Sequence, residues 1–239
     1  MKKVIGVFAA LCVMAGAAFA RGAYDGDIQL HLGVGFDSAK FEKSAAPYSG
    51  YVAKTTSEGA SATFDFDIAT WHLFNFNDVF GLGFVVGFNG GIGGTTKMAW
   101  KSSDSLGNTV SGQMKEKDLF LAAHFNGIIG PAVGINLGNV VKFDIGLGLA
   151  YGFGMFSSEY LDEGGYGYSR TTDMYIIGGV GFGAEVQAKF VPNSPVSPVI
   201  GYRFAVIPTK SYTKNSEKYD VDSVNYFNNE IYVGISFNW

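Results

Sequence analysis

The stretch that decides the fold is Phe227-Asn-Asn-Glu-Ile-Tyr-Val-Gly-Ile-Ser-Phe-Asn-Trp239. Side chains alternate between the two faces of an extended strand, so every second residue lies on the same side. One face of this strand is mixed and polar. The opposite face is mainly apolar and consists of Phe227, Asn229, Ile231, Val233, Ile235, Phe237 and Trp239. This pattern predicts a β-strand with one apolar face, ending on an aromatic residue. Because Trp is favoured at the membrane interface, we expect the closing strand of a membrane barrel.

The composition agrees with a membrane protein that lacks a spanning helix. Of 239 residues, 47% are hydrophobic and only 16% are charged, whereas soluble domains carry about 25% charged residues. After residue 20, no stretch reaches the ~20 consecutive apolar residues of a spanning helix. Apolar surface without such a helix leaves a buried core or a closed barrel in lipid.

The first twenty residues are typical of a secretory signal peptide. Lys2 and Lys3 precede an apolar run, and Ala18-Phe19-Ala20 forms a small-residue cleavage site. We therefore expect a signal peptide over residues 1–20 and one barrel domain over 21–239. Cleavage would remove the only cysteine, Cys12, and two of the 17 basic residues but none of the 21 acidic ones. The remaining acidic chain is not expected to bind nucleic acid.

The same alternation recurs upstream and predicts seven further strands, over residues 27–37, 58–69, 79–89, 118–128, 140–153, 172–190 and 196–208. The connections alternate in length, with long polar loops predicted over 38–57, 90–117, 154–171 and 209–226. Outer-membrane barrels have an even number of strands, short periplasmic turns and long extracellular loops. The sequence therefore predicts an all-β fold, an eight-stranded antiparallel up-and-down transmembrane β-barrel.

A soluble lipocalin-like barrel would also alternate, so the composition of the less apolar face has to distinguish the two. A solvated exterior would carry many Lys, Glu and Arg side chains. Here that face is rich in glycine and alanine, which suits the crowded interior of a narrow barrel. Aromatic residues lie toward the strand ends of the apolar face, as in the girdles of membrane barrels: Phe36, Phe80, Phe88, Tyr151, Phe190, Tyr202, Phe237 and Trp239.

From residue 27 to 239 the chain resembles the small outer-membrane barrels grouped around OmpA, OmpX and OmpW. Its signal peptide, Gly/aromatic strands and aromatic end are also similar to spirochaete outer-membrane barrels. The resemblance implies a monomer in the bacterial outer membrane, in contact with outer-membrane lipid. It also implies recognition by the barrel-assembly machinery, with Phe237 and Trp239 as the assembly signal. It is architectural, so it transfers function weakly.

The residues do not point to catalysis, a metal or a cofactor. His31 and His124 are expected inside the barrel and His72 in a periplasmic turn, without metal-ligand spacing between them. The glycine-rich segment 90–97 lacks the G-K-[ST] ending of a phosphate loop. No Ser/His/acid cluster is evident. We expect no enzymatic activity.

The strand directions predict two levels within the lumen. A tight turn near Asn193 pairs Phe190 with Pro198, which sets Glu185 opposite Arg203. These two, backed by Asp144 and Lys142, form a predicted charge plug in the periplasmic half. Residues predicted to line an apolar pocket in the upper lumen are Val85, Phe120, Tyr175, Ile177, Ile207 and Tyr232. The alternative is a solid core, ionic below and apolar above.

Two functions follow from these two alternatives. An apolar pocket above a charged floor would bind or pass small hydrophobic molecules, an arrangement that resembles OmpW. A solid lumen would leave a structural or adhesin-like surface protein. It would contact a host surface molecule through loops rich in Tyr, Ser, Gly and Lys.

Overall fold

The computed structural model describes residues 24–48, 51–113, 119–164 and 167–239. The predicted signal peptide, residues 1–20, lies outside the described residues. Within the described ranges, no helix is long and apolar enough to cross a membrane.

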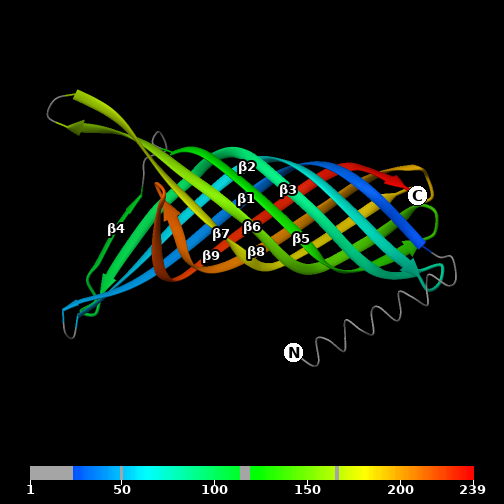
Figure 1. The fold of residues 1–239 in the computed structure, drawn as a ribbon, viewed down its shortest axis with the longest axis horizontal. Helices are drawn as coiled ribbons and strands as arrows, with labels where there is room; N and C mark the ends of the chain where they lie inside the picture. The colour runs from blue at the N-terminus through cyan, green and yellow to red at the C-terminus, as the bar shows by residue number, and fades with distance from the viewer. Residues whose placement is uncertain (1–23, 49–50, 114–118, 165–166) are drawn as a thin grey trace.

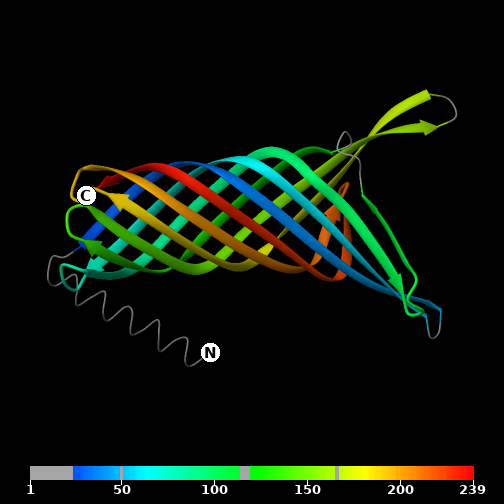
Figure 2. The same ribbon diagram turned by 180° about the vertical axis from the view of Figure 1, so that it is seen from behind.

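The described residues form a closed antiparallel barrel (Figures 1 and 2). Strands pair with their neighbours in chain order, and the last strand returns to pair with the first. The short strand β4 pairs only with the end of β3, beyond the ladder that β3 makes with β5. The ring therefore has eight positions, which confirms the predicted fold. The strands are β1 (Tyr24–Tyr48), β2 (Tyr51–Asn75), β3 (Phe80–Asp104), β4 (Thr109–Gln113), β5 (Leu119–Leu137), β6 (Val141–Gly164), β7 (Gly167–Phe190), β8 (Val196–Lys214) and β9 (Glu217–Asn238).

A belt of exposed apolar side chains surrounds the barrel. The eight aromatic residues predicted to face outward are all exposed, from Phe237 at 40% to Tyr151 at 64%. Exposed Phe, Leu, Ile and Val on every strand of the ring fill the belt between them. A closed barrel satisfies its backbone groups internally, and such a belt is stable only against acyl chains. The protein is a transmembrane β-barrel of the outer-membrane type, located in the bacterial outer membrane.

The two ends of the barrel differ. At the turn end, short connections at 76–79, 138–140 and 191–195 join the strands, and β1 begins where β9 ends. At the hairpin end the strands run on beyond the belt as paired hairpins, and the β6–β7 hairpin projects furthest (Figure 1). Within the described residues, the prediction of long loops was therefore wrong, since most of these residues lie in strands. The polar Ser, Thr and Lys residues in these strands continue the ladders, because a hairpin in water needs backbone pairing but no apolar face. Residues 49–50, 114–117 and 165–166 of the predicted loops lie outside the described residues.

Two predicted turns were also too long. Strand β2 continues beyond its predicted end at residue 69 to Asn75, so His72 lies in a strand and not in a turn. Strand β5 passes through Pro131, which lies opposite Phe84 of β3. Pro131 has no N–H to donate, and the β5–β6 ladder skips this position, between Ile129 and Ala132. Strand β5 therefore runs beyond its predicted end at residue 128 to Leu137, because the sheet tolerates one missing hydrogen bond.

The pairing between β7 and β8 lapses over part of its length. The strands pair from Lys189 to Phe182 of β7, and then only at Ile176 and Tyr175. Residues 177–181 of β7 and 207–212 of β8 lie between these two paired stretches. We call this interval the β7–β8 seam. Pro208 lies within it and cannot donate a ladder hydrogen bond.

Inward-facing glycines make room for large side chains that cross the lumen. A Cβ on Gly201 would lie 2.3 Å from the ring of Tyr232, and one on Gly154 would lie 2.3 Å from the ring of Tyr226. Both distances are far below van der Waals contact. The glycine-rich inner face is therefore the surface against which the luminal side chains pack.

Candidate functional site

The Glu185–Arg203 pair lies at the centre of the lumen. The two residues are directly opposite each other in the β7–β8 register, as the turn near Asn193 predicts. Arg203 Nε donates to Glu185 Oε2 at 3.2 Å and Nη2 donates to Oε1 at 3.1 Å, a bidentate geometry. Arg203 Nη1 also lies 3.3 Å from Asp67 Oδ1 and 3.6 Å from Glu230 Oε2. One guanidinium thus holds three carboxylates from three other strands.

Tyr232 belongs to this charged centre, which corrects its predicted place in an upper apolar pocket. Its hydroxyl donates to Glu185 Oε1 at 2.7 Å, and its ring centroid lies 5.7 Å from Arg203 Cζ. His31 stacks on the same ring at 4.2 Å. Tyr232 lies only six residues from the end of β9 at Asn238, so it falls in the turn half of the barrel. The hydroxyl group of Tyr232, more than its aromatic ring, determines that this side chain lies among charged residues.

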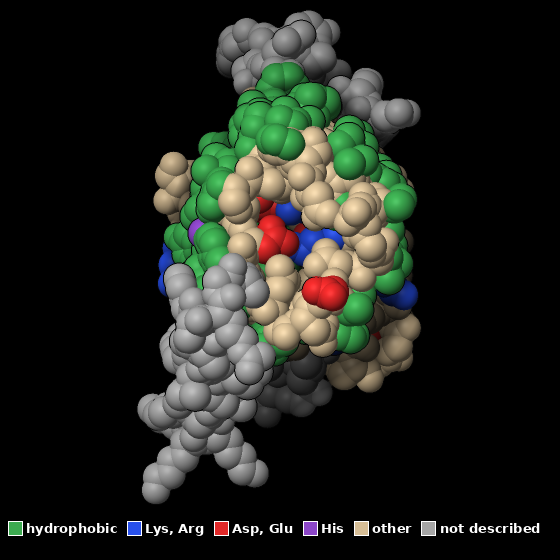
Figure 3. Space-filling view, turned by 90° about the vertical axis from the view of Figure 1, so that its right-hand side faces the viewer, with side chains coloured by type: hydrophobic (Ala, Val, Ile, Leu, Met, Phe, Trp, Pro, Cys, Tyr) green, Lys and Arg blue, Asp and Glu red, His purple; other side chains and the backbone are tan. Residues whose placement is uncertain are grey.

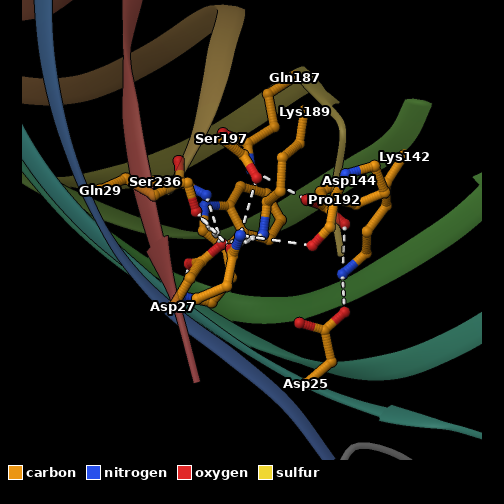
Figure 4. A network of polar contacts seen from close by, with 12 residues as sticks. Asp25, Asp27, Gln29, Lys142, Asp144, Gln187, Lys189, Pro192, Ser197 and Ser236 are labelled. Carbon is orange, nitrogen blue, oxygen red and sulfur yellow. Dashed lines mark hydrogen bonds and ion pairs between the residues drawn. The ribbon is translucent and has the colours of Figure 1, made fainter. Parts of the chain in front are cut away.

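Lys142 and Asp144 lie near the start of β6, toward the turn end. Figure 4 shows them beside Asp25. Lys142 Nζ lies 3.3 Å from Asp144 Oδ1 and donates to Asp25 at the mouth. Gln187 Nε2 donates to Asp144 at 3.0 Å, and Tyr232 donates to Gln187 Oε1 at 3.3 Å. The four residues of the predicted charge plug are therefore joined into one network by hydrogen bonds and by the Lys142–Asp144 ion pair.

A second ion pair, Lys189 with Asp27, lies beside the charge plug (Figure 4) and was not predicted. Asp27 also accepts hydrogen bonds from Gln29 at 2.8 Å and Ser236 at 2.9 Å. Asp27 is fully buried, although it lies near the start of β1. Its inward position follows from the alternation, but its partner is 162 residues away and depends on how the barrel closes.

The network continues upward to Asp37, which was also missed. Asp37 accepts hydrogen bonds from Tyr226 Oη and Asn228 Nδ2, both at 2.8 Å, and lies 2.9 Å from His124 Nδ1. Asn89 Nδ2 joins this group to the centre by donating to Glu230 at 3.0 Å. Glu230 and Asp37 both fall on the polar face in the sequence pattern, which is the signal that could have identified them.

The buried charges of the lumen do not balance. Among the described residues, the buried fixed cations are Lys142, Lys189 and Arg203. The buried carboxylates are more numerous: Asp27, Asp37, Asp65, Asp67, Asp144, Glu185 and Glu230. Seen from the turn end, acidic and basic side chains occupy the middle of the ring (Figure 3). The lumen is thus a filled, charged interior at this end.

Above this network, toward the hairpin end, the buried side chains become apolar. Ile177 and Ile207 are fully buried, as predicted for the upper lumen. They pack with other side chains into a cluster that we call the cup floor: Ala39, Phe41, Phe156, Ile177, Ile207, Val224 and Tyr226. Tyr226 belongs to both levels, because its ring lies in the floor and its hydroxyl bonds Asp37.

A cavity of about 410 Å³ lies above this floor, and we call it the cup. Phe41 and Phe156 form its base, and Tyr175 lines it as predicted. The Tyr212 ring packs edge-on against Phe41 at 4.9 Å and stacks on Tyr219 at 5.4 Å. The other lining residues are Lys43, Thr55, Ser57, Glu58, Gly59, Met98, Ala99, Trp100, Lys214 and Val221. Sequence analysis missed most of these because it assigned them to loops.

Two residues predicted for the upper pocket lie elsewhere. Val85 is buried in the turn half, in a second apolar cluster with Trp71 and Leu73. It comes only five residues after β3 begins, so an outward-running strand has not yet reached the upper lumen. Phe120 is 52% exposed and faces outward. The β5–β6 register is irregular between Leu119 and Ala122, which breaks the alternation used to place it.

The aromatic end of β9 contributes to the outer belt at the turn end. Phe237 and Trp239 are both exposed, and the Trp239 N–H donates to Gly26 O at 3.1 Å. The Trp239 ring lies 6.4 Å from the ring of His72, which also stacks on Phe84 at 4.6 Å. These residues form an interfacial girdle. Their role as an assembly signal stays a prediction.

The luminal histidines are hydrogen-bonded within the network. His31 Nε2 lies 2.9 Å from Gln29 Oε1, and His124 lies between Asp37 and Asn89. Among the residues that the structure describes, no group of three or more His, Cys, Asp or Glu side chains is arranged to hold a metal ion. The arrangement therefore offers two features with chemical consequences, the luminal network and the cup.

Comparisons with known proteins found no matching family model and no matching curated protein. Solved structures with a similar barrel include the outer membrane protease OmpT from Escherichia coli, at 10% identity and a TM-score of 0.44 over 90% of this chain and 96% of that one. Ail of Yersinia pestis matches at 12% identity and 0.38, over 90% and 99%. OprG from Pseudomonas aeruginosa matches at 12% and 0.42, over 90% and 96%. None of these three is from a spirochaete, and at this similarity their functions do not transfer to the chain.

Proposed function

We propose that the protein binds small hydrophobic molecules in the cup, at the cell surface, and does not form an open pore. The observation that supports this is the cavity of about 410 Å³ directly above the apolar cup floor. Ligand pockets of about 300–1,000 Å³ lined by apolar and aromatic side chains suit small molecules. The lining here has that character, with Phe41, Trp100 and Tyr212 among its aromatic residues.

The luminal network supports the second half of the proposal. Below the floor, Tyr226 bonds Asp37, and the chain of contacts runs through Glu230 and Arg203 to Lys142 near the turn end. Side chains that fill a narrow lumen and bond one another leave little path for hydrated ions. The charge plug therefore makes the cup a closed-bottomed site, from which a bound molecule does not continue to the periplasm.

The proposal requires the hairpin end to face the outside. Outer-membrane barrels place short turns in the periplasm and long segments at the surface, and the hairpins here are long at one end only. The aromatic end of β9 lies at the opposite, turn end, where the assembly machinery would recognise Phe237 and Trp239. The partners of this protein would then be membrane lipid, that machinery and the ligand.

Binding can be measured with the mature protein in lipid nanodiscs. The neutral probe 8-bromooctanol quenches tryptophan fluorescence on contact, and Trp100 lines the cup. The wild type should show saturable quenching. Gly59→Leu should bind at least tenfold more weakly, because a Cβ at Gly59 lies 3.4 Å from the Phe156 ring and a longer side chain enters the cavity.

A matched control places the same side chain on the outer wall. Gly90 faces lipid, and a Cβ there would meet its nearest atom, His124 O, at 3.6 Å, an ordinary contact. Gly90→Leu should bind like the wild type. Quenching that only rises linearly with probe, or equal binding by Gly59→Leu, would disprove the cup as a site. The protein would then be better described as a structural or adhesin-like surface protein acting through its hairpins.

A further inference from the structure

The cup is apolar at its floor and carries lysine side chains at its rim. This difference bears on the kind of molecule that the cup holds. On β1, Phe41 belongs to the floor and Lys43, the next inward residue, lines the cup. A strand rises about 3.3 Å per residue, so Lys43 lies about 7 Å further toward the hairpin end. On β8 the order is the same, from Ile207 in the floor to Tyr212 and then Lys214.

The carboxylates near the cup are already engaged. Glu58, the one acidic residue among the lining side chains, lies 2.7 Å from Lys97 Nζ, outside the cup. Asp173 lies 2.9 Å from Lys214 Nζ. Asp222 accepts a hydrogen bond from the Ser44 backbone N–H at 2.7 Å. Glu58 and Asp173 are therefore paired with lysines, and Asp222 is held by a backbone N–H.

The pKa of Asp222 is lowered chiefly by hydrogen bonds from Ser44, and the positive charge of Lys43 contributes to that lowering without a direct ion pair. Among the described residues, no carboxylate lies within 4 Å of the Lys43 ammonium group. Burial opposes the charge of Lys214, but its contacts with Asp173 and Tyr175 together outweigh burial and raise its pKa, so Lys214 keeps its charge as well. Its Nζ also lies 5.3 Å from the centre of the Tyr175 ring. The rim thus carries two lysine side chains, Lys43 and Lys214, above an apolar floor.

We propose that the cup selects single-chain amphiphiles with an anionic head, of which a fatty-acid carboxylate is the simplest. The apolar chain points down to Phe41 and Phe156, and the head lies at the rim beside Lys43. This inference rests on the proposed function, and it specifies in addition the headgroup of the bound molecule. A neutral molecule would occupy the same floor and leave Lys43 without a partner. An exposed ion pair is worth at most about 1 kcal/mol, or about fivefold in affinity.

The same nanodisc assay tests the headgroup with three probes of equal chain length. At pH 8, in phosphatidylcholine, the expected order of affinity is 8-bromooctanoate, then 8-bromooctanol, then 8-bromooctylammonium, with about fivefold between the first two. Lys43→Gln should remove the preference for the carboxylate while binding of the alcohol stays. Lys43→Glu should reverse it in favour of the ammonium probe. Lys210→Gln, an exposed lysine on β8 outside the cup, should keep the wild-type order.

The outcomes separate this inference from the function on which it rests. If the alcohol binds but the carboxylate binds no more tightly, or if Lys43→Glu keeps the wild-type order, the anionic class is wrong and the cup stands. If neither probe binds saturably, the cup itself is not a site. A salt series gives an independent check, because screening should weaken the preference for the carboxylate and leave the alcohol unaffected.

Discussion

Replacing Arg203 with alanine should both destabilise the barrel and open the lumen to ions. Arg203 is 2% exposed and is the cation that Glu185, Asp67 and Glu230 share. Removing one partner of a buried pair costs about 3–5 kcal/mol, because the remaining charges stay buried and unpaired. Three carboxylates lose their partner here, which places the cost at the upper end. Water entering the vacated lumen lowers it, so we expect about 3–5 kcal/mol in the free energy of unfolding.

Glu185→Gln is the milder change and keeps the shape of the site. Arg203 retains Asp67 and Glu230, so the loss is one hydrogen bond to a charged group, about 1.5–3 kcal/mol. Lys210→Ala, an exposed substitution on the same strand, should stay within about 0.5 kcal/mol of the wild type. Urea unfolding in lipid vesicles, followed by tryptophan fluorescence, measures all three.

Planar bilayer recordings then test whether these residues block the lumen. The wild type should conduct poorly, and Arg203→Ala should conduct more. A wild type with large steady channels would show that the charge plug does not close the barrel. An Arg203→Ala variant that loses under about 1 kcal/mol and conducts like the wild type would refute the electrostatic reasoning itself.

Three further predictions follow. A cysteine at Ser216 should react with an impermeant maleimide on intact cells and one at Ser194 should not, and the reverse would invert the orientation. Deleting residues 237–239 should leave secreted but protease-sensitive protein, whereas normal heat-modifiable barrels would show that these residues do not signal assembly. Lys54 leads the contacts that lower the pKa of Glu42. This stabilisation is present above the ordinary pKa of about 4.5 and is lost as the pH falls below it. Protection of the β1–β2 hairpin amides, measured as the exchange rate relative to that of an unstructured chain at the same pH, should therefore fall in acid, and Glu42→Gln should abolish that change.

The sequence predicts the features that depend on local alternation and on a tight turn. Period-two patterning places the lipid-facing aromatic residues, and the turn near Asn193 determines the pairing of Glu185 with Arg203. Contacts across the barrel cannot be read in this way. Asp37 and His124 lie 87 residues apart, and their meeting depends on the stagger of all the strands.

Strand ends were harder to predict than strand centres. Within the belt, lipid demands apolar side chains on alternate residues, so the pattern is strong. Beyond it, water accepts almost any side chain on either face, and a hairpin looks like a loop. The cup is built mainly from such residues, Lys43 and Tyr212 among them, which is why its walls were missed. Phe120 was misplaced because one irregular pairing reverses the face of the residues beside it.

The β7–β8 seam makes one part of the wall easier to open than the rest. Residues 177–181 stay paired with β6, but their backbone groups that face β8 lie outside a ladder. Backbone amides outside a ladder exchange with solvent at a low free-energy cost, so the β8-facing amides of residues 177–181 should exchange faster than those of residues 182–189. The seam begins at Ile177 and Ile207, both in the cup floor. A brief separation of the two strands would therefore connect the bottom of the cup with the acyl chains outside. An apolar chain could then pass sideways into the membrane without crossing either water or the charged half of the lumen.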